Sequence, residues 1–234
     1  MTDHQHGTAV ATAGADAASA SRGSGALSPL FTGLLGLLIG LAVGAALFSG
    51  SGGGSAADGD AGTLVAADEV PRSSLGADDA PVTVTLYSDF LCPYCQQHDQ
   101  QVEPELVERY VETGEVRLVW HDLPLQGPGA MDLAVAGRAA ELQDGFWEFK
   151  EEVFSHGADP APEAVAAAAD RAGLDTDRFQ QDLDDPALEL AVRRDLEQAR
   201  QLGVQATPAF VVGDQGMMGL QSIEALAAAI QEAG

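Results

Sequence analysis

The chain has 234 residues, of which 36 are acidic and 11 are basic, and its formal net charge is −25. This length accommodates one substantial domain with an appendage, and an apolar fraction of 46% excludes wholesale disorder. We expect no nucleic-acid partner, because such binding depends on cationic side chains that displace counterions. The acidity extends along the whole chain, which indicates either a highly solvated surface or halophilic adaptation to high salt.

The chain has only two cysteines, Cys92 and Cys95. Two cysteines cannot staple a small scaffold with several disulfides, and they cannot form a four-cysteine zinc site. We therefore expect these two residues to act with each other or with an external group.

The first 80 residues divide into three segments of different composition. Residues 1–26 are small and polar without apolar periodicity, which predicts a disordered leader. Residues 27–48 carry no charge and are long enough to cross a bilayer, so we expect a single transmembrane signal anchor. Arg22 precedes this run and Asp58 is the first charge after it, which places the N-terminus in the cytoplasm and the remainder outside. Residues 49–80 are predicted to be a flexible linker.

From Pro81 to residue 233 the pattern is that of an α/β domain. Alternating apolar residues predict strands at 82–87 and 116–120, and a helix between them that ends at Gly114. A helical insertion is expected over about 129–202, in segments 131–143, 145–155, 162–172, 176–183 and 187–202. A third short strand, Ala209–Val212, is followed by a turn and by a last helix that starts near Gln221. The order predicts helices arranged around a small mixed sheet.

The motif Cys92-Pro93-Tyr94-Cys95 falls where the first strand gives way to a helix. A helix N-terminus carries partial positive charge and unpaired amides, which stabilise a thiolate on Cys92. Pro93 lacks an N–H that the first helical turn leaves unpaired in any case. Cys95 follows one turn later, within disulfide reach and expected to be less exposed. The spacing therefore predicts an attacking thiol of lowered pKa with a resolving thiol beside it.

His98 extends the motif to Cys-x-x-Cys-x-x-His, which leaves metal binding open as an alternative. A tetrahedral zinc site needs a fourth ligand, and only His121 or Asp89 is available for it. Redox chemistry is favoured over this reading, and no metal site is predicted.

Thr207-Pro208 directly precedes the third strand. A trans proline in a turn would fit this position, but the strand–Cys-x-x-Cys–helix unit changes the interpretation. The pair resembles the cis-proline loop of thioredoxin-fold proteins, in which the proline faces the active-site disulfide. The resemblance implies that Pro208 keeps the dithiol accessible and that the backbone of Thr207 pairs with a substrate chain as an added strand.

Residues 81–233 resemble the DsbA-like thiol–disulfide oxidoreductases. The resemblance rests on the runs Tyr87–Cys95 and 206–213, on Pro104 and on Phe146-Trp147. It implies a thioredoxin-like fold with an inserted helical subdomain, and a redox-active Cys92–Cys95 disulfide with no other cofactor.

Two positions depart from the family pattern. Leu86 occupies the place, six residues before Cys92, where these proteins often carry an acid beneath the resolving thiol. Asp89 is the nearest carboxylate, and it is either a proton acceptor for Cys95 or a solvated surface acid. Tyr94 stands where strong oxidants have histidine, which leaves the reduction potential open.

The resemblance implies an enzyme that donates its disulfide, through a mixed disulfide on Cys92, to cysteine-containing secreted or surface proteins. A membrane redox partner would reoxidise it. The alternatives are a disulfide reductase or isomerase of the same fold, or a non-enzymatic tethered or metal-binding module that uses Cys92, Cys95 and His98. On any of these hypotheses, the protein is expected at the cell membrane with its catalytic domain extracytoplasmic.

Overall fold

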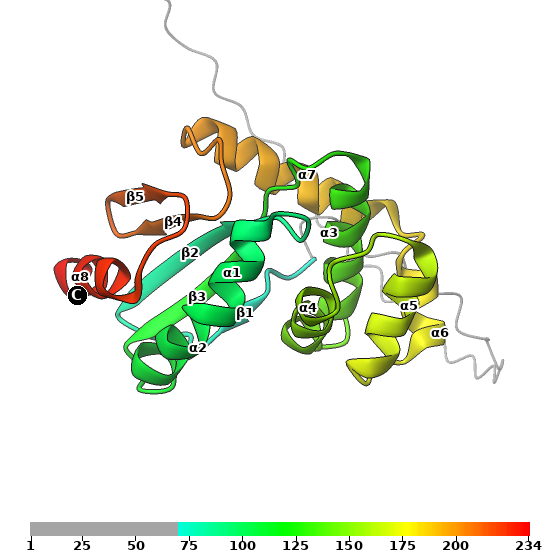
Figure 1. Ribbon diagram of the computed structural model, residues 1–234, viewed down its shortest axis with the longest axis horizontal. Coiled ribbons are helices and arrows are strands. Elements are labelled where there is room, and N and C mark those ends of the chain that lie inside the picture. The colour runs from blue at the N-terminus through cyan, green and yellow to red at the C-terminus, as the bar shows by residue number, and fades with distance from the viewer. Residues whose placement is uncertain (1–69) are drawn as a thin grey trace, which may run out of the picture. The chain divides into compact units, whose positions relative to one another are not determined.

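The computed structural model describes residues 70–234, which form a mixed sheet flanked by helices (Figure 1). The sheet has five strands in the order β1-β3-β2-β4-β5. In chain order the strands are β1 (Ser74–Leu75), β2 (Val82–Ser88), β3 (Val116–Asp122), β4 (Ala209–Val212) and β5 (Gln215–Met218). The central pair β2 and β3 is parallel, and β4 joins β2 antiparallel. The predicted α/β fold with three main strands is confirmed.

The strands form because their apolar residues alternate. Val82, Val84 and Leu86 of β2 are all buried, whereas Thr83 between the first two is exposed. Such a period of two places one row of side chains in the core. The last three residues of β2 are buried without alternation, because the helical block covers the end of this strand.

The chain after Cys95 is helical, as predicted, but it is not one continuous helix. It divides into α1 (Pro93–Gln101), α2 (Glu103–Leu106) and the π-helical turn η1 (Val107–Val111). The break falls at Val102 because Pro104 cannot donate the backbone hydrogen bond that a continuous helix requires. The segment ends at Gly114, whose φ of +81° is readily adopted by glycine.

The predicted helical insertion lies between β3 and β4. Its helices are α3 (Pro128–Glu141), α4 (Phe146–Ser155), α5 (Pro162–Arg171), α6 (Thr176–Asp182) and α7 (Pro186–Gln201). Proline stands in the first turn of α3, α5 and α7, where its missing N–H costs nothing. The last helix, α8 (Ile223–Ala233), follows β5 and begins two residues after the predicted start.

An aromatic cluster joins the sheet to the insertion. Phe90, which follows β2, packs against Trp120 of β3 and Phe154 of α4 with ring centroids 5.2 and 5.5 Å apart. Phe146 adds a contact of 5.2 Å to Trp120. All four rings are buried, so the insertion and the sheet share one apolar core.

The folded region begins earlier than the sequence indicates. Ser74 and Leu75, which fall in the predicted linker, pair antiparallel with β3, and Val70 belongs to the core. A strand of two residues is too short to carry a recognisable alternation, so the sequence pattern misses it. The predicted leader, the predicted transmembrane anchor at 27–48 and residues 49–69 of the linker lie outside the described residues. Within residues 70–234, every helix is too short or too polar to cross a bilayer.

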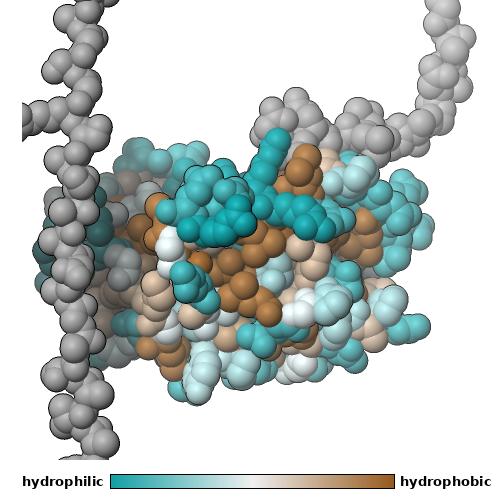
Figure 2. Space-filling model, turned by 90° about the horizontal axis from the view of Figure 1, so that it is seen from above, coloured by the Kyte–Doolittle hydropathy of each residue, from teal (hydrophilic) through white to brown (hydrophobic). Residues whose placement is uncertain are grey.

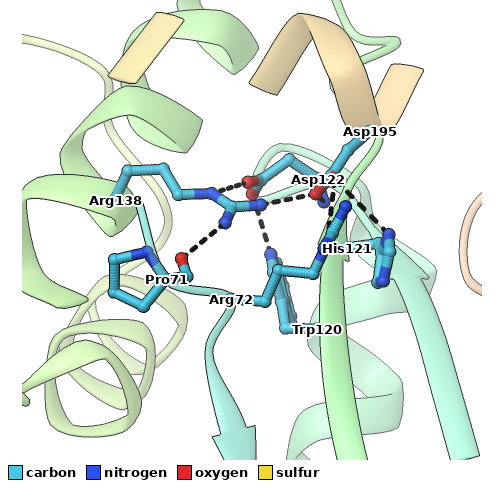
Figure 3. Close-up of polar contacts among 7 residues, drawn as sticks. All are labelled: Pro71, Arg72, Trp120, His121, Asp122, Arg138 and Asp195. Atoms are coloured by element: carbon cyan, nitrogen blue, oxygen red, sulfur yellow. Dashed lines mark hydrogen bonds and ion pairs between the residues drawn. The ribbon is translucent and has the colours of Figure 1, made fainter. Parts of the chain in front are cut away.

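A buried ion cluster also fixes the insertion to the sheet (Figure 3). Arg138 of α3 donates to Asp122 at the end of β3, to Asp195 of α7 and to the carbonyl oxygen of Pro71. The indole N–H of Trp120 donates to the other Asp122 oxygen at 2.8 Å. One guanidinium therefore ties two helices, a strand and the N-terminal segment together.

Candidate active site

Cys92 lies at the N-terminus of α1, at the position that the sequence predicts. It is the N-cap residue, and its carbonyl oxygen accepts the first backbone hydrogen bonds of the helix, from Cys95 at 3.0 Å and Gln96 at 3.1 Å. Pro93 occupies the first helical position. The sulfur of Cys92 is thus next to the unpaired amides and the positive end of the helix dipole.

The Thr207–Pro208 loop faces Cys92. The peptide bond between Thr207 and Pro208 is cis, as the resemblance implies, and the carbonyl oxygen of Thr207 lies 3.4 Å from the Cys92 sulfur. The loop arrives there because β4 begins at Ala209 and pairs antiparallel with β2, the strand that leads into the Cys92 motif. Sheet pairing therefore joins two segments that lie 115 residues apart in the sequence.

Several hydrogen bonds stabilise the Cys92 thiolate. The thiol of Cys95, the hydroxyl of Thr207 and the backbone N–H groups of Cys95 and Tyr94 together lower the pKa of Cys92 to about 5, although burial opposes them. The Cys95 thiol makes the largest contribution. At neutral pH Cys92 is therefore a thiolate, which is the form that attacks disulfides.

Cys95 has the opposite environment. Burial is the main cause that raises its pKa, and the hydrogen bond that its thiol gives to Cys92 raises it further. The hydroxyl of Ser88 and the backbone N–H of Asp89 act against this shift. Both cysteines are free thiols here, and their exposed fractions are 3% for Cys92 and 2% for Cys95. One sulfur thus carries the negative charge and the other holds a proton for it.

Tyr94, between the two cysteines, lies at the surface of the molecule. Its side chain is 60% exposed, and Pro93 beside it is exposed as well. The dipeptide between the cysteines is therefore accessible to solvent at the N-terminus of α1.

Asp89 is buried, so the expectation of a solvated surface acid is wrong. Its carboxylate accepts the backbone N–H groups of Leu91 at 2.8 Å, Leu125 at 2.7 Å and Gln126 at 2.9 Å. Burial raises the pKa of Asp89, and these three bonds counteract the shift. The carboxylate fixes the loop after β3 against the Cys92 loop, while Asp89 reaches Cys95 through its backbone N–H. Proton transfer by Asp89 stays a prediction.

His98 and His121 do not form a metal site with the cysteines. The ring of His98 packs edge-on against Phe210, with centroids 4.9 Å apart, and its Nε2 is 3.8 Å from Glu103. His121 lies in the Arg138 cluster, 3.5 Å from Asp195. Across residues 70–234, no three His, Cys, Asp or Glu side chains converge on a point that could hold a metal ion. The arrangement assigns both histidines to the interior and does not support the metal-binding alternative.

A second buried ion cluster links α1 to the insertion, and the sequence analysis does not identify it. Lys150 of α4 is the only lysine of the chain, and it is 3% exposed. It donates to Asp99 of α1 at 2.5 Å and to Glu103 of α2. A lysine among the apolar positions of α4 could have indicated this cluster from the sequence, because a buried cation requires a carboxylate partner.

Two further buried polar residues, Asp195 and Ser88, are also not predicted from the sequence, and only the first could have been recognised from its position. Asp195 lies among the buried positions of α7, between Val192 and Ala199, and it accepts from Arg138. A charge on the apolar face of a helix predicts a buried partner, but it does not identify that partner. The role of Ser88 could not be recognised from the sequence, since a serine at the end of a strand is common.

Comparisons with known proteins agree with this geometry. A family model described as Thioredoxin matches residues 69–232. The chain is 38% identical over 160 residues to the Na(+)/H(+) antiporter NhaA 3 of Salinispora tropica, and the match covers 68% of this chain but only 24% of that protein. It is 33% identical over 150 residues to a probable disulfide bond formation protein D of Bacillus anthracis, covering 60% of this chain and 69% of that one.

Solved structures give the same result for the fold. A thioredoxin-like oxidoreductase from Silicibacter pomeroyi superposes with a TM-score of 0.64 and 28% sequence identity. The superposition covers 71% of this chain and 94% of that structure. The similarity therefore includes both the sheet and the helical insertion.

Proposed function

Because the chain belongs to the thioredoxin family and, within it, to the DsbA-like thiol–disulfide oxidoreductases, we propose that it donates the Cys92–Cys95 disulfide to client proteins. The clients are cysteine-containing secreted or surface proteins. Cys92 is the attacked and leaving sulfur, Cys95 is the resolving thiol, and the backbone at Thr207 and Pro208 holds the client chain beside them.

The observation that carries this proposal is the difference between the two sulfurs at one helix terminus. Cys92 has its pKa lowered to about 5 by the Cys95 thiol, the Thr207 hydroxyl and backbone amides, whereas burial raises the pKa of Cys95. Reduction of the disulfide therefore produces a stabilised thiolate on Cys92. A disulfide whose reduced form is stabilised is a strong oxidant, so electrons flow from the client to this protein.

The reaction proceeds by two exchanges. A client thiolate attacks the Cys92 sulfur, the Cys92–Cys95 bond breaks, and Cys95 leaves as a thiolate that takes up a proton. A second client thiolate then attacks the client sulfur of the mixed disulfide, and Cys92 leaves as a thiolate. The client loses two electrons and gains a disulfide, and the protein gains those two electrons.

The protein acts at the outer side of the cell membrane. Residues 27–48 would anchor it there with the N-terminus in the cytoplasm, and a membrane redox partner would accept the two electrons from the reduced dithiol. The uncharged run at 27–48 supports this placement, as does the oxidising environment in which protein disulfides form and persist.

The test is the reduction potential of the full-length protein, equilibrated in glutathione buffers between pH 4 and pH 8. We expect a value of about −120 mV at pH 7, as for a strong oxidant. Above the pKa of Cys92, reduction takes up one proton, so the potential should fall by about 30 mV per pH unit, against about 59 mV below it. Alkylation of the two thiols reports the redox state.

Two outcomes would count against the proposal. A potential of about −270 mV would favour a reductase, an alternative that the apolar Leu86 and the uncharged Tyr94 leave open. The absence of a reversible couple would remove thiol–disulfide exchange altogether. The Cys92→Ser variant is the control, because it retains one thiol and has no intramolecular disulfide.

A further inference from the structure

The first exchange of the proposed reaction leaves a negative charge inside the protein. When a client thiolate attacks the Cys92 sulfur, the electron pair of the broken bond stays on Cys95, which is 2% exposed. Figure 2 shows hydrophobic and hydrophilic side chains mixed over one face of the molecule, but a side chain as deeply buried as Cys95 meets almost no solvent at any face. Such an anion is costly unless hydrogen-bond donors of the protein replace the missing water.

One face of β2 is turned to the cysteines and carries a single polar side chain. Because successive side chains of a strand alternate between its faces, this face consists of Val82, Val84, Leu86 and Ser88. Leu86 packs in the same core cluster as Cys95, whereas Tyr87, on the opposite face, belongs to a second cluster. Leu86 has no group that can donate a hydrogen bond, so Ser88 supplies the hydroxyl of this face.

The Ser88 hydroxyl and the backbone N–H of Asp89 both reach the Cys95 sulfur, and both lower the pKa of Cys95 against the effect of burial. The backbone that carries these two donors is fixed on each side. The carbonyl oxygen of Ser88 accepts the N–H of Leu123 at 2.8 Å, and that of Asp89 accepts the N–H of Cys92 at 3.0 Å. Ser88 itself is 2% exposed, so its hydroxyl is held beside the sulfur without competition from bulk water.

The ionisable side chains around the pair are engaged by other partners or uncharged. The Asp89 carboxylate accepts three backbone N–H groups, and Asp122 at the end of β3 accepts from Arg138. His98, one turn of α1 after Cys95, is neutral because burial lowers its pKa to about 3. The stabilisation of a charge on Cys95 therefore depends on neutral donors.

We propose that Ser88 is a catalytic residue, whose hydroxyl stabilises the Cys95 thiolate as it leaves Cys92. The client sulfur forms a bond to Cys92, the Cys92–Cys95 bond breaks, and the electron pair remains on Cys95, to which the Ser88 O–H donates. Ser88 keeps its proton, and Cys95 afterwards takes one from water. The inference rests on the proposed function and deepens it, because a hydrogen bond to an anion is stronger than one to a neutral sulfur and therefore favours the step in which Cys95 is charged.

The first test measures how fast reduced glutathione opens the disulfide of the oxidised full-length protein, with alkylation of acid-quenched samples to count the free thiols. Ser88→Ala should lower this rate about tenfold, because one of the two donors to the leaving thiolate is lost. The equilibrium constant with glutathione should change by less than about threefold, since Cys95 is uncharged in both the disulfide and the dithiol. A change confined to the rate separates stabilisation of the anion from a general loss of structure.

The second test titrates Cys95 alone. The chain has two cysteines, so Cys92→Ala leaves Cys95 as its single thiol and also removes the charge of Cys92. The ultraviolet absorbance of the thiolate follows the titration between pH 5 and pH 11. Adding Ser88→Ala to this variant should move the titration up by about one pH unit, which corresponds to the tenfold change in rate.

Two further variants isolate the hydroxyl. Ser88→Thr keeps it and should restore the opening rate to within about threefold of the wild type. Ser73→Ala is the matched control, because it removes an equally buried hydroxyl, 1% exposed, from the segment directly before β1, a strand that β3 separates from β2. Its opening rate should remain within about twofold of the wild type.

An opening rate for Ser88→Ala equal to that of the wild type, or an equal loss in Ser88→Thr or Ser73→Ala, would overturn the role of the Ser88 hydroxyl. A wild-type protein without a reversible couple to glutathione would instead refute the proposed function, and the assignment of Ser88 with it.

Discussion

Two buried ion clusters fasten the helical insertion to the rest of the molecule, and they differ in completeness. In the Arg138 cluster each guanidinium nitrogen has an acceptor, and Asp122 also receives the Trp120 indole N–H. In the Lys150 cluster Oε2 of Glu103 and both ring nitrogens of His98 have no hydrogen-bond partner, whereas in the Arg138 cluster Nδ1 of His121 lacks one.

The two clusters also join different parts of the molecule. The Arg138 cluster ties α3 and α7 to the end of β3. There Asp122 lies opposite Ser88 of β2 in the sheet, and the Ser88 hydroxyl hydrogen-bonds to Cys95. The Lys150 cluster ties α4 to α1, the helix that carries the cysteines. A network in which more polar atoms lack a partner is less stable and more sensitive to protonation.

The largest effect is expected for Arg138→Met. This change leaves Asp122 and Asp195 buried without their main cation, which costs about 3–5 kcal/mol of the free energy of unfolding. Urea denaturation at pH 7 measures the loss, and Arg171→Met, which breaks an exposed pair, is the control. A loss below about 1 kcal/mol would mean that the cluster does not fasten the insertion.

Lys150→Met should destabilise the protein by about 2–4 kcal/mol at pH 8, less than Arg138→Met because Asp99 and Glu103 keep slight exposure. Without the cation, the two carboxylates raise each other's pKa in the folded state. The folded variant then binds more protons than the unfolded chain, so its stability relative to the wild type should recover as the pH falls to 5.5. Urea denaturation at both pH values checks this, and a constant difference would contradict it.

His98→Leu tests the Lys150 cluster directly. Burial and, to a lesser degree, the charge of Lys150 lower the pKa of His98 to about 3, so the folded protein keeps it neutral while the unfolded chain protonates it below pH 6.5. The wild type therefore loses stability between pH 6.5 and about 3, and the variant lacks that loss. Between pH 7 and pH 4.5 the variant should therefore gain about 2–3 kcal/mol of stability relative to the wild type. Thermal or urea unfolding across this range measures it.

The control for His98→Leu is the same change at His156, whose side chain is 55% exposed. Equal behaviour of the two variants would show that burial in the Lys150 cluster does not cause the pH dependence. The other cluster has its own buried histidine: burial, Arg72 and Arg138 lower the pKa of His121 to about 4.

The smallest effect is expected for Arg171→Met. Arg171 pairs with Glu152 at 2.6 Å and joins α5 to α4, but both side chains are partly exposed. Solvent screens such a pair, so the loss should be below about 0.5 kcal/mol and should vanish in 1 M salt. A loss of unfolding free energy as large as that of Lys150→Met would show that buried ion pairs do not stabilise this protein more than exposed ones.

The local elements of this protein could be predicted from residue patterns along the chain. Apolar spacing located the three main strands and the helices of the insertion, and the motif at 92–95 was placed correctly at a strand–helix junction. These signals act within a few residues, because alternation and helical periodicity report which face of an element is buried. They did not report the edge strand at Ser74, which is too short, or the break at Val102, where Pro104 interrupts a helical pattern.

The contacts of each buried face became known from the three-dimensional structure. Thr207 contacts Cys92 because β4 pairs with β2 across 115 residues, and the resemblance to a family, not the residues alone, indicated that contact. Asp89 turned out to be a buried acceptor, since the loop after β3 folds onto it. The partners of Arg138 and Lys150 were equally hidden, because periodicity shows that a side chain is buried but not which distant group neutralises it.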